Sequence, residues 1–170
     1  VLFRSRDGLD DLIAVDMLAR RHEERLTFLE KSQRPELVLS QVDARPQFTR
    51  NTLQVQREDH TFADVAFLAG LGATDWAWSP VFLDVDLDGY EDLLVANGFH
   101  RAVEDIDVAD RIRQLKSERR LTPGEELGLR GLFPKWETPN LAFHNRGDLH
   151  FEEAGRDWGF DTPGVSQGMA

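Results

Sequence analysis

The sequence predicts a mainly β fold, namely part of a β-propeller whose four-stranded blades carry helical insertions. Two observations support this fold class. Short apolar runs alternate with turn residues such as Gly, Pro, Asn and Asp, which is typical of strands in all-β proteins. The chain also repeats itself internally, and repeated four-stranded units are the building blocks of propellers.

The internal repeat is found by sliding the sequence along itself. At an offset of 89, NTLQVQREDHTFADV falls on NLAFHNRGDLHFEEA, with Asn51 matching Asn140. At an offset of 81, RDGLDDLIAVD falls on LDGYEDLLVAN, with Gly8 matching Gly89. We therefore expect two copies of one structural unit.

The complete copy contains four short apolar segments that we expect to be strands, at residues 81–83, 93–96, 141–144 and 150–153. An aspartate-rich loop joins the first pair, and the turn NRGD joins the second pair. The earlier copy is expected to have the same four-stranded plan.

A helical segment interrupts each copy between its second and third strands. In DVADRIRQLKSERRL, the apolar residues Val108, Ile112 and Leu115 recur at helical spacing. In the following TPGEEL, Thr122 is placed to cap a second helix, with proline at the first helical position and Glu125 completing a capping box. The first copy has a looser helical pattern at about residues 18–31.

These patterns divide the chain into three parts, which are a truncated blade at 6–67 with a helical insert, a complete blade at 68–157 with an insert at about 101–133, and the start of a further blade at 158–170. The first five residues, VLFRS, match one translation of a common sequencing adapter. We therefore expect Val1–Ser5 to be an assembly scar and the chain to be a fragment of a longer protein.

The stretch VFLDVDLDGYEDLL contains the clearest candidate for a binding site. Its loop, residues 84–92, has carboxylates at positions 1, 3, 5 and 9, a glycine at position 6 and a backbone carbonyl at position 7. Oxygen ligands in this order form a site for a hard cation. We expect Ca²⁺ to be held by four side chains and one carbonyl, from Asp84, Asp86, Asp88, Asp92 and Tyr90.

This loop differs from an EF-hand, because position 12 is a valine in an apolar strand instead of a glutamate entering a helix. The corresponding loop of the first copy is degenerate. Asp7, Leu9 and Asp11 match the second half of the pattern, whereas Phe3 and Ser5 stand where the ungapped alignment expects the first two aspartates. We expect this first loop to bind calcium weakly or not at all.

The loop and its flanks, FADVAFLAGLGATDWAWSPVFLDVDLDGYEDLLVANG and NLAFHNRGDLHFEEAGRDWGF, resemble the FG-GAP or VCBS repeat of integrin-α-like β-propellers, whose loops read D-x-D-x-D-G-x-x-D. The wider context is similar to bacterial relatives of cartilage acidic protein, which pair such repeats with an ASPIC/UnbV domain. The resemblance covers most of residues 6–170, apart from the inserts. It implies calcium-stabilised blades in an exported or cell-surface protein, with structural and interaction roles.

The same resemblance implies a protein or glycan ligand on the loop face of the propeller. It does not imply a reaction, and we expect the chain to be no enzyme and to contain no catalytic residues. An alternative remains open. The chain is then the non-catalytic portion of an exported enzyme, for example a carbohydrate-active one, whose active site lies in sequence outside these residues.

Composition argues against several other classes of protein. The net charge of −11 argues against a nucleic-acid partner, since phosphate binding needs a basic face. The absence of cysteine excludes disulfides and thiolate metal sites from this sequence. No apolar run approaches the roughly 18 residues of a membrane helix, and no signal peptide is visible at the start.

Two short stretches of the sequence match enzymatic patterns in part. A strand running into D-x-D also opens the haloacid dehalogenase fold, but glycine follows Asp88 where that family has Thr or Val, and the repeat has no place there. The stretch GVSQG matches the nucleophile elbow of hydrolases. The repeat, however, places Ser166 just ahead of an expected strand instead of a helix.

Histidine and tryptophan give weaker signals. The five histidines lack the spacing of a metal-binding helix, and we interpret the two on neighbouring strands, His144 and His150, as surface or packing residues. The four tryptophans are more typical of packing between blades than of sugar stacking, and they are Trp76, Trp78, Trp136 and Trp158.

Overall fold

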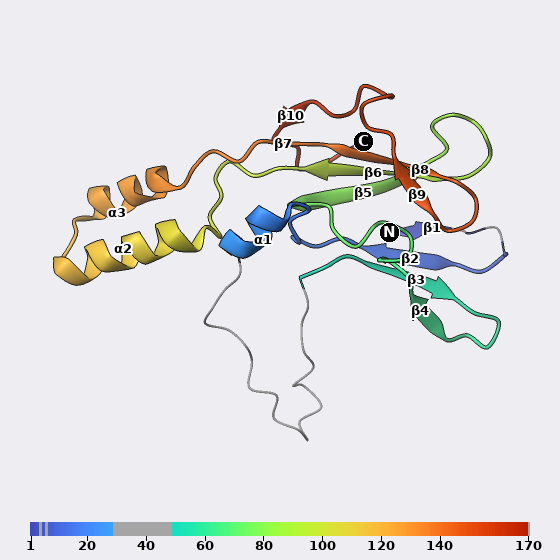
Figure 1. Cartoon of the computed structure of the whole chain (residues 1–170), viewed down its shortest axis with the longest axis horizontal. Helices are drawn as coiled ribbons and strands as arrows, with labels where there is room; N and C mark the ends of the chain where they lie inside the picture. The colour runs from blue at the N-terminus through green and yellow to red at the C-terminus, as the bar shows by residue number, and fades with distance from the viewer. Residues whose placement is uncertain (4, 6, 29–48, 170) are drawn as a thin grey trace, which may run out of the picture.

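The computed structural model describes residues 1–3, 5, 7–28 and 49–169. The described residues form three antiparallel sheets, two of them four-stranded, together with a few short helices (Figure 1). The expectation of a mainly β chain with four-stranded units and helical insertions is thus confirmed at this level. Within the described residues, no helix is long and apolar enough to cross a membrane.

Each four-stranded sheet is a meander in which consecutive strands lie side by side. The first sheet contains, in order, β1 (Leu2–Phe3), β2 (Asp11–Ala14), β3 (Thr52–Gln56) and β4 (Phe62–Asp64). The second sheet contains β5 (Ala77–Leu83), β6 (Asp92–Asn97), β8 (Leu141–Asn145) and β9 (Phe151–Glu153). A third, two-stranded sheet pairs β7 (Thr138–Pro139) with β10 (Pro163–Gly164).

The repeat seen in the sequence extends to individual hydrogen bonds. The Val65 amide donates to the carbonyl of Leu53, and 89 residues later the Ala154 amide donates to that of Ala142, both at 2.8 Å. The turns that follow β4 and β9 also match, because Gly70 and Gly159 both have positive φ, +79° and +67°. The two sheets are therefore copies of one unit in detail, as the offset of 89 predicted.

The first loop departs from the ungapped alignment by one residue. In β1, Phe3 pairs with Asp11, whereas in β5 the residue that pairs with Asp92 is Leu83. Seven residues thus separate the paired Phe3 and Asp11, whereas eight separate Leu83 and Asp92. Phe3 consequently takes the place of Leu83 and not that of an aspartate, and its side chain is buried at 3% exposure.

One hydrophobic core is shared by the two four-stranded sheets. Ile13 and Leu53 of the first sheet and Leu93 of the second are fully buried in the same cluster. The Phe3 ring stacks on that of Phe82 across the two sheets, with ring centroids 4.4 Å apart. Burying apolar side chains of this size stabilises each by about 1.5–3 kcal/mol, so the two sheets hold each other in place.

The helices occupy the connection between the second and third strands of each sheet. They are α1 (His22–Phe28) in the first copy, and α2 (Ile106–Glu118), α3 (Pro123–Leu129) and the 3₁₀ helix η1 (Arg130–Leu132) in the second. The expected capping box of α3 is present, with Thr122 and Glu125 bonded reciprocally. The first insert was expected at 18–31, of which residues 29–31 lie outside the described part.

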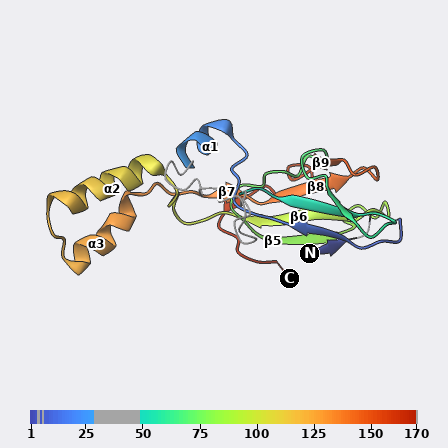
Figure 2. The same ribbon diagram turned by 90° about the horizontal axis from the view of Figure 1, so that it is seen from below.

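The α2–α3 hairpin projects from the end of the sheets opposite to loop 84–91, and Figures 1 and 2 show it extending away from the strands. None of its helical residues is buried. At its base, a second small cluster packs Trp76, Trp136 and Ala102 together. Trp76 and Trp136, each 8% exposed, pack against each other within the second copy, with Met17 of the first copy beside them, whereas Trp78 is 42% exposed. Packing between the copies, which was expected of the tryptophans, thus involves only Met17 at this cluster among the described residues.

Candidate metal centre

The loop between β5 and β6 concentrates negative charge at one point of the surface. Residues 84–92 carry five carboxylates and no Lys or Arg. One oxygen each of Asp84, Asp86 and Asp92 lies within 4.8 Å of the other two. Two like charges 4.8 Å apart repel by about 3.5 kcal/mol at an effective dielectric constant near 20, and by more when they are closer. A cation at their centre would remove that repulsion.

Short-range hydrogen bonds give the loop its shape. The Gly89 amide donates to Asp84 Oδ2 at 3.0 Å, the Asp88 amide to Asp86 Oδ1 at 3.2 Å and the Tyr90 amide to Asp88 Oδ1 at 2.8 Å. Gly89 has φ +91°, a conformation that is easily reached only without a Cβ. Each of these aspartates thus accepts a backbone amide further along the loop, and these hydrogen bonds hold the loop in its turned conformation.

Asp84 has the feature that most directly indicates a cation. Its Oδ1 atom is buried and has no hydrogen-bond partner. A buried oxygen without a partner is costly, by about 1–3 kcal/mol for a neutral group and more for a charged one. A hard cation held by the group that Asp84 forms with Asp86 and Asp92 would offer this oxygen a partner, and the residues present fit such an ion.

Asp92 is placed differently from the other three aspartates, because it is fully buried. Its Oδ2 accepts the Val85 amide and its Oδ1 accepts the Asn145 amide of β8, both at 2.9 Å. Asp11 of the first sheet repeats this arrangement, accepting the amides of Ser5 and Gln56. The carboxylate at position 9 therefore links the loop to the third strand of its sheet through hydrogen bonds that need no metal.

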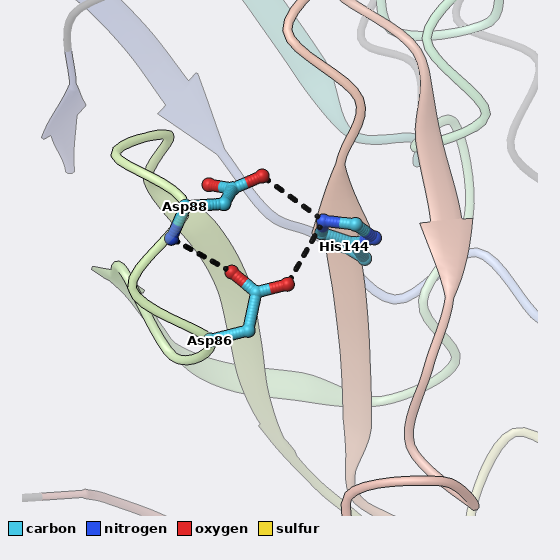
Figure 3. A group of neighbouring side chains, drawn as sticks. All are labelled: Asp86, Asp88 and His144. Carbon is cyan, nitrogen blue, oxygen red and sulfur yellow. Dashed lines mark hydrogen bonds and ion pairs between the residues drawn. The ribbon is translucent and has the colours of Figure 1, made fainter.

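His144 joins the site from β8, and this residue was expected only to pack or to face solvent. Its Nε2 lies 3.2 Å from Asp86 Oδ2 and 3.4 Å from Asp88 Oδ2, as Figure 3 shows. The sequence gives no motif for this approach, since His144 is 58 positions from Asp86 and 56 from Asp88 and meets them only through the register of β6 and β8. Asp86 belongs to both groups of possible ligands, one with Asp84 and Asp92 and one with Asp88 and His144.

Tyr90, the expected carbonyl ligand, packs its ring over the turn between β8 and β9. A Cβ placed on Gly147 would come within 2.6 Å of that ring, so a glycine is needed where φ is also +82°. The contact holds the acidic loop against the NRGD turn. That the Tyr90 carbonyl binds the metal stays a prediction.

The degenerate first loop shows part of the same geometry. The Leu9 amide donates to Asp7 Oδ1 at 2.8 Å, which reproduces the bond between Tyr90 and Asp88, and Gly8 has φ +87°. Among the described residues, which omit 4 and 6 of this loop, Asp7 and Asp11 do not belong to a group of three possible metal ligands. That this loop binds calcium weakly or not at all stays a prediction.

The two enzymatic patterns find no support in the described residues. Strand β5 does run into Asp84, but it belongs to an antiparallel meander. The Ser166 amide donates to the carbonyl of Asn97, and residues 165–169 have no regular structure, so no helix follows this serine within the described chain. The nucleophile elbow requires such a helix.

Comparison of the chain with protein-family models, with curated proteins and with solved structures finds no match.

Proposed function

We propose that the chain is a calcium-binding β-propeller module of the FG-GAP/VCBS type, with structural and interaction roles in an exported or cell-surface protein. The observation that carries this proposal is loop 84–92, in which three carboxylates converge and the buried Oδ1 of Asp84 has no hydrogen-bond partner. The ion is held by Asp84, Asp86, Asp88, Asp92 and the carbonyl of Tyr90.

Calcium suits this loop better than magnesium does. Ca²⁺ accepts 6–8 oxygen ligands in a flexible arrangement, whereas Mg²⁺ demands a near-ideal octahedron and keeps several of its waters. Four carboxylates and a carbonyl crowded into nine residues offer more protein oxygens than a hydrated Mg²⁺ uses. We expect a dissociation constant of about 10⁻⁴ to 10⁻³ M, the range of extracellular calcium modules.

The propeller architecture is supported by the way the two copies meet. In a propeller, similar four-stranded units pack face to face around an axis. Here two copies share one core, with Phe3 of the first stacked on Phe82 of the second. The Phe151 amide of the second sheet also donates to the Ala69 carbonyl of the turn after β4, which links the units through the backbone.

We place the surface that binds a protein or glycan ligand at the end of the sheets that carries the acidic loop. Binding residues are disproportionately found on loops that a rigid scaffold positions. Here the loop before β6 and the turn between β8 and β9 are tied together by Tyr90 and Gly147. A protein or glycan ligand approaching this face would meet a calcium-ordered surface.

Isothermal titration calorimetry of the full chain with Ca²⁺ tests the metal site. Asp86→Ala removes a residue that is shared by both groups of possible ligands, so we expect its heat of binding to fall to background. Asp157→Ala, which removes one exposed acid outside the loop, should bind as the unchanged protein does. Equal heats for all three proteins would refute the site.

A further inference from the structure

His144 brings a nitrogen ligand to an edge of the acidic loop that the proposed calcium ligands leave unexplained. Its side chain is only 18% exposed, and its ring packs edge-on against Trp158 at 5.9 Å between centroids. The next residue, Asn145, is fixed by its backbone hydrogen bond to Asp92. The imidazole is therefore held in place by a strand and an indole, and Figure 3 shows it facing both carboxylates.

A hydrogen bond alone accounts poorly for this arrangement. Nε2 carries at most one proton and makes at most one well-aligned bond, yet it faces one oxygen of Asp86 and one of Asp88 at 3.2 and 3.4 Å. Ligands about 2.0–2.1 Å from a tetrahedral zinc ion lie about 3.3–3.4 Å from one another. The observed separations match the edges of such a tetrahedron.

The chemistry of the three ligands also favours a metal other than calcium. Imidazole nitrogen suits Zn²⁺, Cu²⁺, Fe²⁺ and Ni²⁺, whereas Ca²⁺ and Mg²⁺ take oxygen ligands. Three protein ligands with a water in the fourth position are a recurrent zinc arrangement. Because all three side chains are partly accessible, an ion can enter from solvent.

We propose that Asp86, Asp88 and His144 form a second coordination site, which takes a borderline divalent ion such as Zn²⁺ through His144 Nε2 and one oxygen of each aspartate. This site shares Asp86 and Asp88 with the proposed calcium site, so the two ions exclude each other. It uses neither Asp84 nor Asp92, and its existence does not depend on calcium binding.

Cobalt provides the test, because Co²⁺ stands in for Zn²⁺ and its visible absorption reports tetrahedral nitrogen and oxygen ligands. The full chain is titrated with Co²⁺, then with Zn²⁺ in competition, and separately with Ca²⁺. His144→Gln should weaken Co²⁺ binding by more than about tenfold, since even losing a partner outside the coordination shell costs 10–100-fold. His150→Gln, on the neighbouring turn and 56% exposed, is the matched control and should leave binding unchanged.

A second pair of variants separates this proposal from the calcium proposal. Asp84→Asn should abolish Ca²⁺ binding and retain Co²⁺ binding, whereas His144→Gln should do the reverse. Circular dichroism melts establish that each variant is folded. Equal Co²⁺ affinity in His144→Gln and the unchanged chain, or no Co²⁺ spectrum in the unchanged chain, overturns the second site. If the unchanged chain binds no Ca²⁺ while its cobalt spectrum is intact, only the calcium proposal is overturned.

Discussion

At the scale of single residues, one aspartate position serves the same structural purpose in both sheets. Asp11 and Asp92 are both fully buried, and each accepts one amide from its own loop and one from the third strand. The sequence pattern placed both among possible metal ligands, but it could not show that each also accepts two backbone amides. Those hydrogen bonds depend on which side chains the strand register buries.

We predict that Asp92→Asn destabilises the protein even when no metal is present. Asp92 accepts a backbone amide with each of its two oxygens. Asparagine has only one oxygen, so its NH₂ group would face one of these amides and leave a buried donor unsatisfied. The cost should be about 1–3 kcal/mol in the free energy of unfolding, measured by urea denaturation in chelator.

Asp86→Asn is the comparison for that measurement, because Asp86 is about one-third exposed and its bond to the Asp88 amide stays within the loop. In chelator its effect should remain within about 0.5 kcal/mol. Equal destabilisation by the two variants would mean that the hydrogen bonds of Asp92 to the loop and to β8 do not stabilise the fold.

Asp75 provides a prediction about pH. Burial raises the pKa of its carboxyl above the ordinary 3.8, against the lowering effect of the Arg20 amide that it accepts. A carboxyl whose pKa is raised on folding penalises the folded state once it ionises, and the penalty is complete above the folded pKa. The φ of Asp75 is +57°, which asparagine also tolerates.

We therefore expect Asp75→Asn to raise the melting temperature at pH 7, with the gain shrinking as the pH falls toward 3.8. The asparagine oxygen still accepts the Arg20 amide, while the buried charge is gone. Thermal melts between pH 4 and 8 provide the measurement. A gain that is constant across this range would show that ionisation of Asp75 is not its cause.

At the scale of elements, the strands and helices were predictable where local signals agree. The α3 capping box and the strands of the second sheet match because caps, turns and apolar runs are short-range features. Strand β5 begins earlier than expected, at Ala77, although it contains Pro80. It lies at the edge of its sheet, where a residue without an amide hydrogen is tolerated.

Other features of the site could not be predicted, because they depend on the pairing of distant strands. His144 reaches Asp86 and Asp88 only when Leu93 of β6 is opposite Phe143 of β8. The one-residue shortening of the first loop likewise shows only in the pairing of Phe3 with Asp11. An ungapped alignment cannot reveal such a shift.

We predict that the α2–α3 hairpin contributes little to stability. Replacing residues 106–132 with a short Gly/Ser linker removes no buried helical residue and keeps its base, where the Ala102 amide donates to the Pro134 carbonyl at 3.0 Å. The free energy of unfolding should change by less than about 1 kcal/mol, as measured by urea denaturation.

Trp136→Ala is the positive control for this deletion, since Trp136 is buried against Trp76 at the base of the hairpin. It should cost about 3–5 kcal/mol. If deleting the hairpin costs as much as this substitution, the helices carry contacts that matter for folding.

At the scale of the whole molecule, the metal loop and the shared core act on the same folding equilibrium. An ion that binds only the folded state stabilises it by RT ln(1 + [L]/Kd). At about 10 mM free Ca²⁺ and a dissociation constant of about 10⁻⁴ to 10⁻³ M, the gain is about 1.4–2.7 kcal/mol. Because Ca²⁺ binds the folded state, we predict that the melting temperature is higher in Ca²⁺ than in chelator.

Mg²⁺ at the same ionic strength controls for screening of the −11 net charge, and it should give a smaller rise. Differential scanning calorimetry gives all three midpoints. Identical midpoints in Ca²⁺ and Mg²⁺ would show that charge screening, and not coordination in loop 84–92, accounts for the effect.

The antiparallel meander gives the two ends of each sheet different connections, with the acidic loop at one end and the helices at the other. Connections between first and second strands fall at one end of each sheet, and connections between second and third strands fall at the other, where α1 and the α2–α3 hairpin lie (Figures 1 and 2). The turn between α2 and α3, residues 119–122, is thus a natural attachment point for a tag or a fluorophore. A protein immobilised there would present its acidic loop outward to solution, with its metal ligands undisturbed by the tether.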